Sequence, residues 1–153
     1  MPATAESARP LIGRWALVGW DGRDDSGAPV SHGGERPSGD LIYLVSGRMA
    51  VQIQWDGRSP LGSIELDAGG EAERAAALST YIAYAGTFSL PEEGVVVHHV
   101  ELCLRPDQVG IDKRRSYDLE GDELTLRTQP LRVAESGDSR ASSELHWRRA
   151  ERF

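Results

Sequence analysis

The stretch VVVHHVEL, from Val95 to Leu102, places two adjacent histidines and a glutamate in an otherwise apolar run. Successive side chains of a β-strand point to opposite faces, so His98 and His99 must lie on opposite sides of any strand formed here. The face of His99 also carries Glu101. The face of His98 is uniformly apolar and comprises Val96, Val100, Leu102 and Leu104. We therefore expect His98 to face the protein interior, and His99 with Glu101 to face solvent.

Two roles for an inward His98 remain open at this point. It is either a core histidine that bonds to a backbone group or a tyrosine, or a hydrogen-bonding and proton-transferring group in an apolar pocket. An ordinary pKa near 6.5 suits a histidine to either role. The reverse orientation would bring His99 and Glu101 inside as an acid–base pair. Burying that pair without partners is costly, so it would require a functional reason or a neighbouring Arg115.

Further polar candidates follow on other segments. Arg115 and Tyr117 share one face of a later strand, where Arg115 would either meet a carboxylate or enolate-like oxygen or extend its charged end to the rim. Three tyrosines are candidates for lining a pocket or packing beside it: Tyr43, Tyr81 and Tyr84.

Sequence motifs for metals and common cofactors are missing. The chain has no H-x-H or C-x-x-C spacing, no phosphate-binding loop, no dinucleotide-binding glycine pattern and no G-x-S-x-G. The single cysteine, Cys103, excludes an internal disulfide and is expected to be an inert buried thiol. We predict that neither a metal nor an organic cofactor is needed.

The charge balance is acidic, with 24 Asp and Glu against 17 Lys and Arg, a net charge of -7 and a pI of about 5.1. This balance argues against nucleic acid or an anionic membrane as the main partner. Lys113 is the single lysine, and we attribute the excess of arginine to genome composition rather than to a basic site. The N-terminal residues do not resemble a signal peptide, and no apolar run is long enough to span a bilayer. We expect a cytoplasmic protein with a disordered tail over residues 1–10 and one domain over residues 11–153.

Short strands separated by Gly, Pro, Asp and Ser turns dominate the pattern. Residues 11–20 alternate as a strand, and residues 21–39 read as a long loop with a short strand near Val30. DLIYLVSGRMAVQIQW predicts a hairpin turning at Ser46-Gly47. A two-residue turn would pair Leu44 with Met49 and Ile42 with Val51 as the inward set, with Tyr43 on the other face; a slip of one residue would reverse every face.

One helix is predicted over residues 71–85, where Ala75, Leu78 and Ile82 would form a buried stripe. Strands follow from GTFSL, from the histidine stretch, from a hairpin across residues 120–122 and from ELHWRRA, with a polar loop over residues 134–142. About eight short strands at this spacing predict an all-β fold, an antiparallel up-and-down barrel with one short helix across or beside an opening.

Several segments, in the same order, resemble the bacterial lipocalin-like domain family, whose fold is a lipocalin- or calycin-type β-barrel. The resemblance begins at LIGRWALVGW, which contains G-x-W at Gly13 and Trp15. It continues through GDLIYLVSGRMAVQI, YIAYAGTF, VVVHHVELCLRPDQVG with Arg115 following, and GDELTL, and ends with W-x-R at Trp147 and Arg149. The chain departs from the pattern in the polar segment 134–143 and in RPDQVG, which lacks an aromatic residue.

The resemblance implies an antiparallel barrel around a cavity, closed at one end by Arg149 packed across Trp15. The wider group includes passive carriers and cyclising enzymes of natural-product pathways, so the fold alone does not fix the function. Our first hypothesis is a barrel that binds a small, mainly hydrophobic molecule in its cavity. The wall would comprise Met49, Val51, Ile53, Trp55, Phe88, Val100 and Leu102, and the polar contacts would come from His98, Arg115, Tyr117 and a tyrosine such as Tyr43 or Tyr84.

Two alternatives stay open. The first is a cofactor-independent cyclase or isomerase of secondary metabolism, acting on a polyketide or terpenoid-like intermediate with His98, or His99 and Glu101, moving a proton. The second is a structural or protein-binding barrel whose core is filled, with the cavity closed by Trp55, Trp147 and Met49. The sequence leaves the ligand's identity open, as well as the choice between a monomer and a homodimer.

Overall fold

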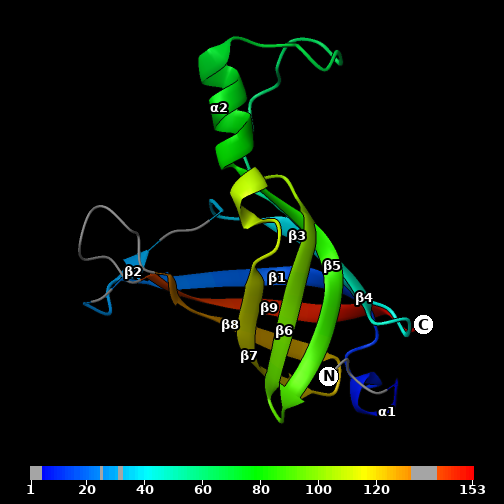
Figure 1. The fold of residues 1–153 in the computed structure, drawn as a ribbon. Coiled ribbons are helices and arrows are strands. Elements are labelled where there is room, and N and C mark those ends of the chain that lie inside the picture. The colour runs from blue at the N-terminus through cyan, green and yellow to red at the C-terminus, as the bar shows by residue number, and fades with distance from the viewer. Residues whose placement is uncertain (1–4, 25, 31–32, 132–140) are drawn as a thin grey trace.

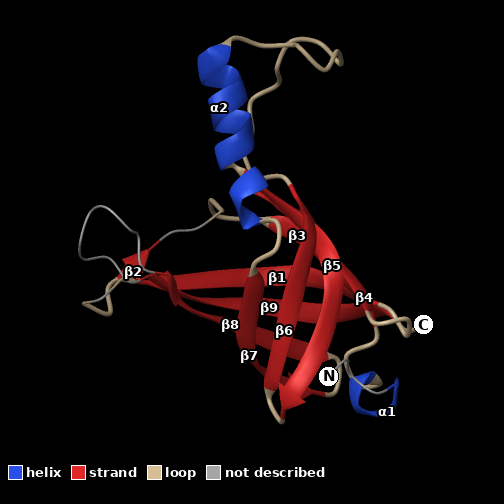
Figure 2. Ribbon diagram, viewed as in Figure 1, coloured by secondary structure: helices blue, strands red, loops and turns tan. Residues whose placement is uncertain are grey.

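The computed structural model describes residues 5–24, 26–30, 33–131 and 141–153. It is an antiparallel β-barrel with a helix that projects from one end (Figure 1, Figure 2). The strands are β1 (Gly13–Arg23), β2 (Pro29–Val30), β3 (Ser38–Tyr43), β4 (Arg48–Gln54), β5 (Tyr81–Glu92), β6 (Val95–Cys103), β7 (Asp112–Glu120), β8 (Glu123–Leu131) and β9 (Ala141–Glu151). The helices are α1 (Ala5–Ala8), α2 (Glu71–Ser79) and the 3-10 turn η1 (Pro106–Gln108).

Eight of the strands close the barrel, as the up-and-down prediction requires. Strands β1 and β3 to β9 pair in chain order, and β9 pairs back onto β1. The two-residue strand β2 only pairs with the last residues of β1. Closure leaves every strand of the barrel paired on both sides, so the sheet has no long open edge.

The β3–β4 hairpin is correctly placed, but the predicted register is wrong by one residue. Tyr43 pairs with Met49, and Ile42 pairs with Ala50. The turn has three residues instead of two, because Leu44 N–H donates to the Arg48 carbonyl and Gly47 takes a φ of +82°, which a glycine adopts readily. The slip turns Tyr43 into the core and leaves Leu44 partly exposed.

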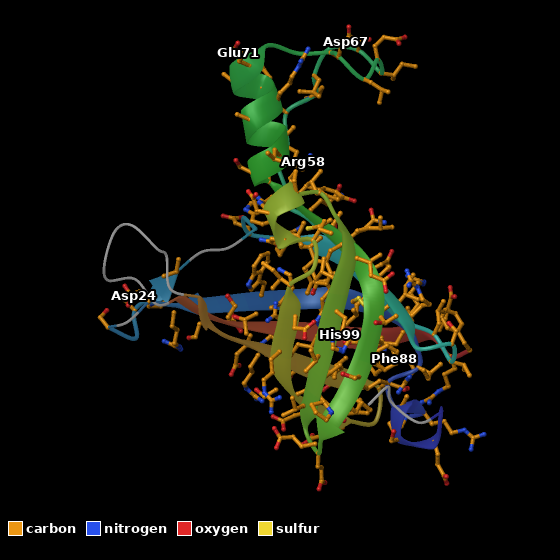
Figure 3. All side chains as sticks on the ribbon, viewed as in Figure 1. Asp24, Arg58, Asp67, Glu71, Phe88 and His99 are labelled. Carbon is orange, nitrogen blue, oxygen red and sulfur yellow. The ribbon has the colours of Figure 1, made fainter. Side chains whose placement is uncertain are left out.

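The predicted helix over residues 71–85 ends early, at Ser79, and the rest of the segment is strand. Tyr81 to Thr87 pair with β4, where the aromatic and β-branched side chains of Ile82 and Tyr84 face the barrel core. No side chain of α2 is buried, so the predicted buried stripe does not exist. Of the two predicted placements, across or beside an opening, the first is wrong: helix α2 extends away from the barrel end (Figure 1), and its last residue, Ser79, borders the cavity described below. Arg58, near the base of α2, donates to Thr80 and to the Ala77 carbonyl (Figure 3).

The barrel end opposite α2 is closed as predicted, by Trp15 and Arg149. The guanidinium carbon of Arg149 lies 4.1 Å from the centre of the Trp15 ring, and its nitrogens donate to the carbonyls of Ile12 and Pro10 and to Asp122. Residues 5–10, expected within a disordered tail, instead carry the turn α1 and bury Ala8 in the core. This end is therefore solidly packed, which leaves only the other half of the barrel for a cavity.

Two further predictions concern the polar loop near the C-terminus and membrane-spanning segments. The polar loop predicted over residues 134–142 lies almost wholly outside the described residues. Within the described residues, no helix is long and apolar enough to cross a membrane.

Candidate functional site

A cavity of about 400 Å³ lies inside the barrel at the end next to α2 and η1. Its apolar wall comes from β1, β3, β4 and the residue that follows it, β5, β8 and β9. The wall consists of Trp20, Leu41, Val51, Ile53, Trp55, Ile82, Leu126, Leu145 and Trp147. Trp20 and Trp55 meet edge to face with ring centres 5.2 Å apart. Polar groups gather mainly on the side of β5, β6, η1 and β7 and comprise Tyr84, His98, Cys103, Arg105, Gln108, Lys113 and Arg115. The remaining lining residues are Ser79, Ala83, Thr128 and Ser143.

His98 lies inside the barrel, as the apolar face of its strand predicts, and is only 1 % exposed. Its Nε2 is 2.6 Å from the hydroxyl of Tyr43, and its Nδ1 is 2.9 Å from the hydroxyl of Tyr84. Burial, together with the positive charges of Arg115 and Lys113, lowers the pKa of His98 to about 3. The ring is therefore neutral near pH 7 and both of its nitrogens are engaged, which matches a core histidine satisfied by tyrosines.

The burial of Tyr43 determines the direction of these two hydrogen bonds. The Tyr43 hydroxyl is fully buried, and burial raises its pKa well above the ordinary value, so it stays protonated. Its proton has only His98 Nε2 as a partner within the described residues, so Nε2 must accept. A neutral His98 then carries its proton on Nδ1 and donates to Tyr84. The Tyr84 hydroxyl proton is thereby left to donate into the cavity that Tyr84 lines.

Three cations line the polar side of the cavity, and two of them, Lys113 and Arg115, lie next to Tyr84. Lys113 lies 5.0 Å from the centre of the Tyr84 ring and donates to Gln108. Arg105 donates to the carbonyls of Tyr81 and Leu78, which ties the segment after β6 to the start of β5. Burial and the neighbouring Arg115 lower the pKa of Lys113. Burial raises the pKa of Tyr84 while Arg115 opposes that shift.

The structure brings some of the predicted cavity residues together and separates others. Val51, Ile53, Trp55, Tyr84, His98 and Arg115 line the cavity. Tyr43, Met49, Phe88 and Val100 are buried but do not line it, because they belong to the packed part of the barrel. Tyr117 is half-buried against the core.

Leu102, predicted to line the cavity, is 65 % exposed on the outside of the barrel. A bulge explains this error, because the pairing of β5 with β6 shifts between Gly86–Val100 and Ala85–Leu102. The extra residue reverses the alternation after Val100. Cys103 consequently faces the cavity in place of Leu102.

His99 and Glu101 point outward, so the acid–base pair proposed for the reverse orientation does not form. Glu101 bonds to Arg48 at 2.5 Å. His99 lies on the outer surface of β6 (Figure 3), with Nε2 2.7 Å from Ser89 and Nδ1 2.7 Å from Asp112. This order of groups resembles a serine–histidine–aspartate relay. The three residues lie on the outer face of the sheet, away from the cavity. Ser89 itself is buried.

Sequence reasoning missed the contributions of Trp20, Cys103, Arg105, Gln108 and Lys113 to the cavity. For Lys113, the single lysine of the chain, strand alternation could have predicted its place in the cavity, because it shares the strand face of Arg115. Arg105 and Gln108 follow the bulge in β6, and their position depends on η1, for which the sequence carried no clear periodicity.

Other candidate sites are less suited to an organic ligand. Among the described residues, no group of three or more His, Cys, Asp or Glu side chains could hold a metal ion. A more open hollow of about 410 Å³ on the outer face of β3 and β4 is about half polar, with Ser38, Asp40, Gln52 and Gln54 among its lining residues. The interior cavity combines a mainly apolar wall with converging polar groups, which is the usual character of a ligand pocket.

An eight-stranded antiparallel barrel with an internal cavity and an arginine stacked on the G-x-W tryptophan is a lipocalin-type barrel. Comparison with protein families matches residues 12–150 to the lipocalin-like domain, and the chain belongs to this family. The chain is also similar to the 4'-hydroxy-3'-methoxypropiophenone carrier protein ppsC of Aspergillus oryzae. The two are 30% identical over 112 residues, which span 69% of this chain and 99% of that protein.

Proposed function

We propose that this protein is a carrier that binds a small, mainly apolar aromatic molecule in the cavity beside α2 and η1. The observation that carries the proposal is the cavity itself, which holds about 400 Å³ and has an apolar wall facing a few polar groups. Its volume lies within the usual range of roughly 300–1,000 Å³ for small-molecule sites. A cavity of this size also argues against the alternative of a barrel filled by its own side chains.

The similar Aspergillus protein supports an aromatic ligand. A 4'-hydroxy-3'-methoxypropiophenone has a phenyl ring with oxygen substituents and a short alkyl ketone. In this cavity the ring would pack against Trp20, Trp55 and Trp147, and an oxygen would accept from the Tyr84 hydroxyl or from the cations. We take this aryl ketone as a chemical guide to the ligand class, and as the first molecule to test.

A cofactor-free cyclase or isomerase is the second candidate, and the geometry supports it less. Acid–base catalysis needs a group that exchanges a proton near the working pH. The pKa of His98 is about 3, so its ring stays neutral at pH 7 and well below it. Both of its nitrogens are hydrogen-bonded to tyrosines. His99 and Glu101, the other acid–base candidates, lie outside the cavity. Binding without conversion therefore fits these residues better.

Fluorescence displacement tests the proposal. N-phenyl-1-naphthylamine, a neutral dye that brightens in apolar surroundings, is expected to bind wild-type protein and to be displaced by 4'-hydroxy-3'-methoxypropiophenone. Thr128→Trp adds an indole to the cavity wall and is expected to weaken dye binding at least about tenfold, or 1.4 kcal/mol. Thr87→Trp, on the outward face of β5 opposite His99, is the matched control and should bind as wild type.

Two outcomes would contradict the carrier proposal. Equal dye binding by both variants would place the dye outside the cavity. Recovery of the ketone in a chemically changed form, measured by mass spectrometry after incubation, would favour the enzyme instead.

A further inference from the structure

The cationic side of the cavity lacks negative charge to balance it. Arg105, Lys113 and Arg115 all line the cavity, and within the described part of the chain none of them forms an ion pair with a carboxylate. No Asp or Glu is among the described residues that line the cavity. The titratable groups facing it, apart from these three, are Tyr84, His98 and Cys103.

This arrangement contrasts with the rest of a chain whose net charge is -7. Strand β7 shows the contrast within three residues. Arg114 points outward and forms an ion pair with Glu92, whereas its neighbours Lys113 and Arg115 point inward without such a partner. Elsewhere on the barrel, outward arginines pair with carboxylates on other strands, as in Arg48 of β4 with Glu101 of β6 and Arg127 of β8 with Asp118 of β7.

Clustered cations of this kind repel one another and are costly to remove from water. Lys113 is partly buried, and the charges of Arg115 and Arg105 both disfavour its protonated form. An anion placed among them would relieve this repulsion. The Tyr84 hydroxyl, whose proton is directed into the cavity, adds a neutral donor next to the cations.

We propose that the cavity selects its ligand as an anion: a mainly apolar, aromatic molecule carrying one oxyanion, held by Lys113, Arg115 and Arg105 beside Tyr84. The inference rests on the proposed carrier function and narrows its ligand class. A phenol conjugated with a ketone fits, because its phenolate charge spreads onto the carbonyl and the molecule loses its proton easily. On binding, that proton is released to solvent.

The test compares two probes that differ by one methyl group, which removes the proton and with it the ability to ionise. One is 4'-hydroxy-3'-methoxypropiophenone, and the other is its 4'-O-methyl ether. The absorption of the phenolate lies at longer wavelength than that of the phenol, so its spectrum reports ionisation directly. Cations within about 4–6 Å lower an acid's pKa by roughly 1–3 units, so we expect the bound phenol to titrate at least about one pH unit below the free one. At a pH above the pKa of the free phenol, where the whole shift contributes, the phenol should bind at least about tenfold more tightly than the ether.

Variants assign the effect to the cavity. Lys113→Met and Arg115→Met keep an unbranched apolar side chain but remove the charge, and each should reduce the spectral shift and the preference for the phenol. Arg114→Met is the matched control, since it removes one positive charge from the same strand on the outer face. It should leave both readouts unchanged.

The outcomes separate this inference from the carrier function. If phenol and ether bind equally and the bound phenol titrates as it does in water, anion selection is wrong while the carrier function stands. If Arg114→Met reduces the preference as much as Lys113→Met does, the effect is one of overall charge and the proposed site is wrong. If neither probe nor the neutral dye binds, the carrier function itself fails.

Discussion

Acid is expected to destabilise this barrel through His98, because the folded protein keeps the ring neutral and the unfolded chain does not. Burial and the charges of Arg115 and Lys113 lower the pKa of His98 from 6.5 to about 3. Between pH 3 and pH 6.5, the His98 ring is protonated in the unfolded chain but stays neutral in the folded protein. The free energy of unfolding is therefore undiminished above pH 6.5 and falls as the pH drops from 6.5 toward 3.

The size of this effect follows from the two pKa values. Within the window, one differing proton changes the free energy of unfolding by about 1.4 kcal/mol per pH unit. Integrated from pH 7 to pH 5, with an unfolded pKa of 6.5, the loss is about 2 kcal/mol. The pKa of His98 in the folded protein lies far below pH 5. The expected loss in the free energy of unfolding is therefore almost independent of the exact value of this pKa.

Urea unfolding of wild type and His98→Gln at pH 7 and pH 5 measures this contribution. Glutamine can accept from Tyr43 and donate to Tyr84 without titrating. The stability lost on acidification should be about 2 kcal/mol larger in wild type than in the variant. Equal losses would refute the reasoning. Should the variant not fold, the C–H resonances of the His98 ring in wild type give the same answer, because a titration midpoint near 6.5 would contradict a ring held neutral.

The remaining stability predictions concern the hydrogen bonds at His98 and at the closed end. Tyr43→Phe leaves a buried imidazole nitrogen without a donor and should cost about 1–3 kcal/mol by urea unfolding, more than Tyr81→Phe, whose hydroxyl bonds to a partner on the surface. A smaller loss for Tyr43→Phe than for Tyr81→Phe would contradict a buried hydrogen bond between Tyr43 and His98. Arg149→Met removes three hydrogen bonds and a ring contact and should cost at least about 2 kcal/mol, whereas the exposed Arg152→Met should stay within about 0.5 kcal/mol of wild type. Similar losses for both arginines would show that the closed end does not depend on this packing.

Much of the fold could be predicted from the sequence, because alternation and turn residues report it locally. The eight barrel strands, their order and the closing contact of Arg149 with Trp15 follow from such patterns and from the family resemblance. Structural details that depend on a single residue could not be predicted in this way. The hairpin register depended on Gly47 closing a three-residue turn, and one residue of error reversed the orientation of Tyr43.

Tertiary pairing overrode local preference in the alanine-rich segment. Residues 71–85 are rich in helix formers, yet β4 draws Tyr81 onward into the sheet, where Ile82 and Tyr84 reach the core. Helix propensity averaged over the whole segment does not reveal the boundary between α2 and β5, because the alanines of α2 outweigh the aromatic residues that follow.

The candidate site was predictable only as far as strand alternation held. It placed His98 inside correctly, and it failed at Leu102 because the bulge after Val100 inserts an extra residue. The cationic side was missed for a different reason. Lys113 and Arg105 come from separate segments that only the barrel brings together, and composition gave no sign that they would lack carboxylate partners.

A methyl NMR titration with 4'-hydroxy-3'-methoxypropiophenone tests the central claim, binding inside the barrel, most directly. Binding inside the barrel should give saturable shifts in the methyl groups of Ile53, Leu126 and Leu145, which line the cavity, while Leu11 at the closed end stays unchanged. Shifts confined to outward methyl groups such as those of Leu102, or no shifts at saturating ketone, would contradict it.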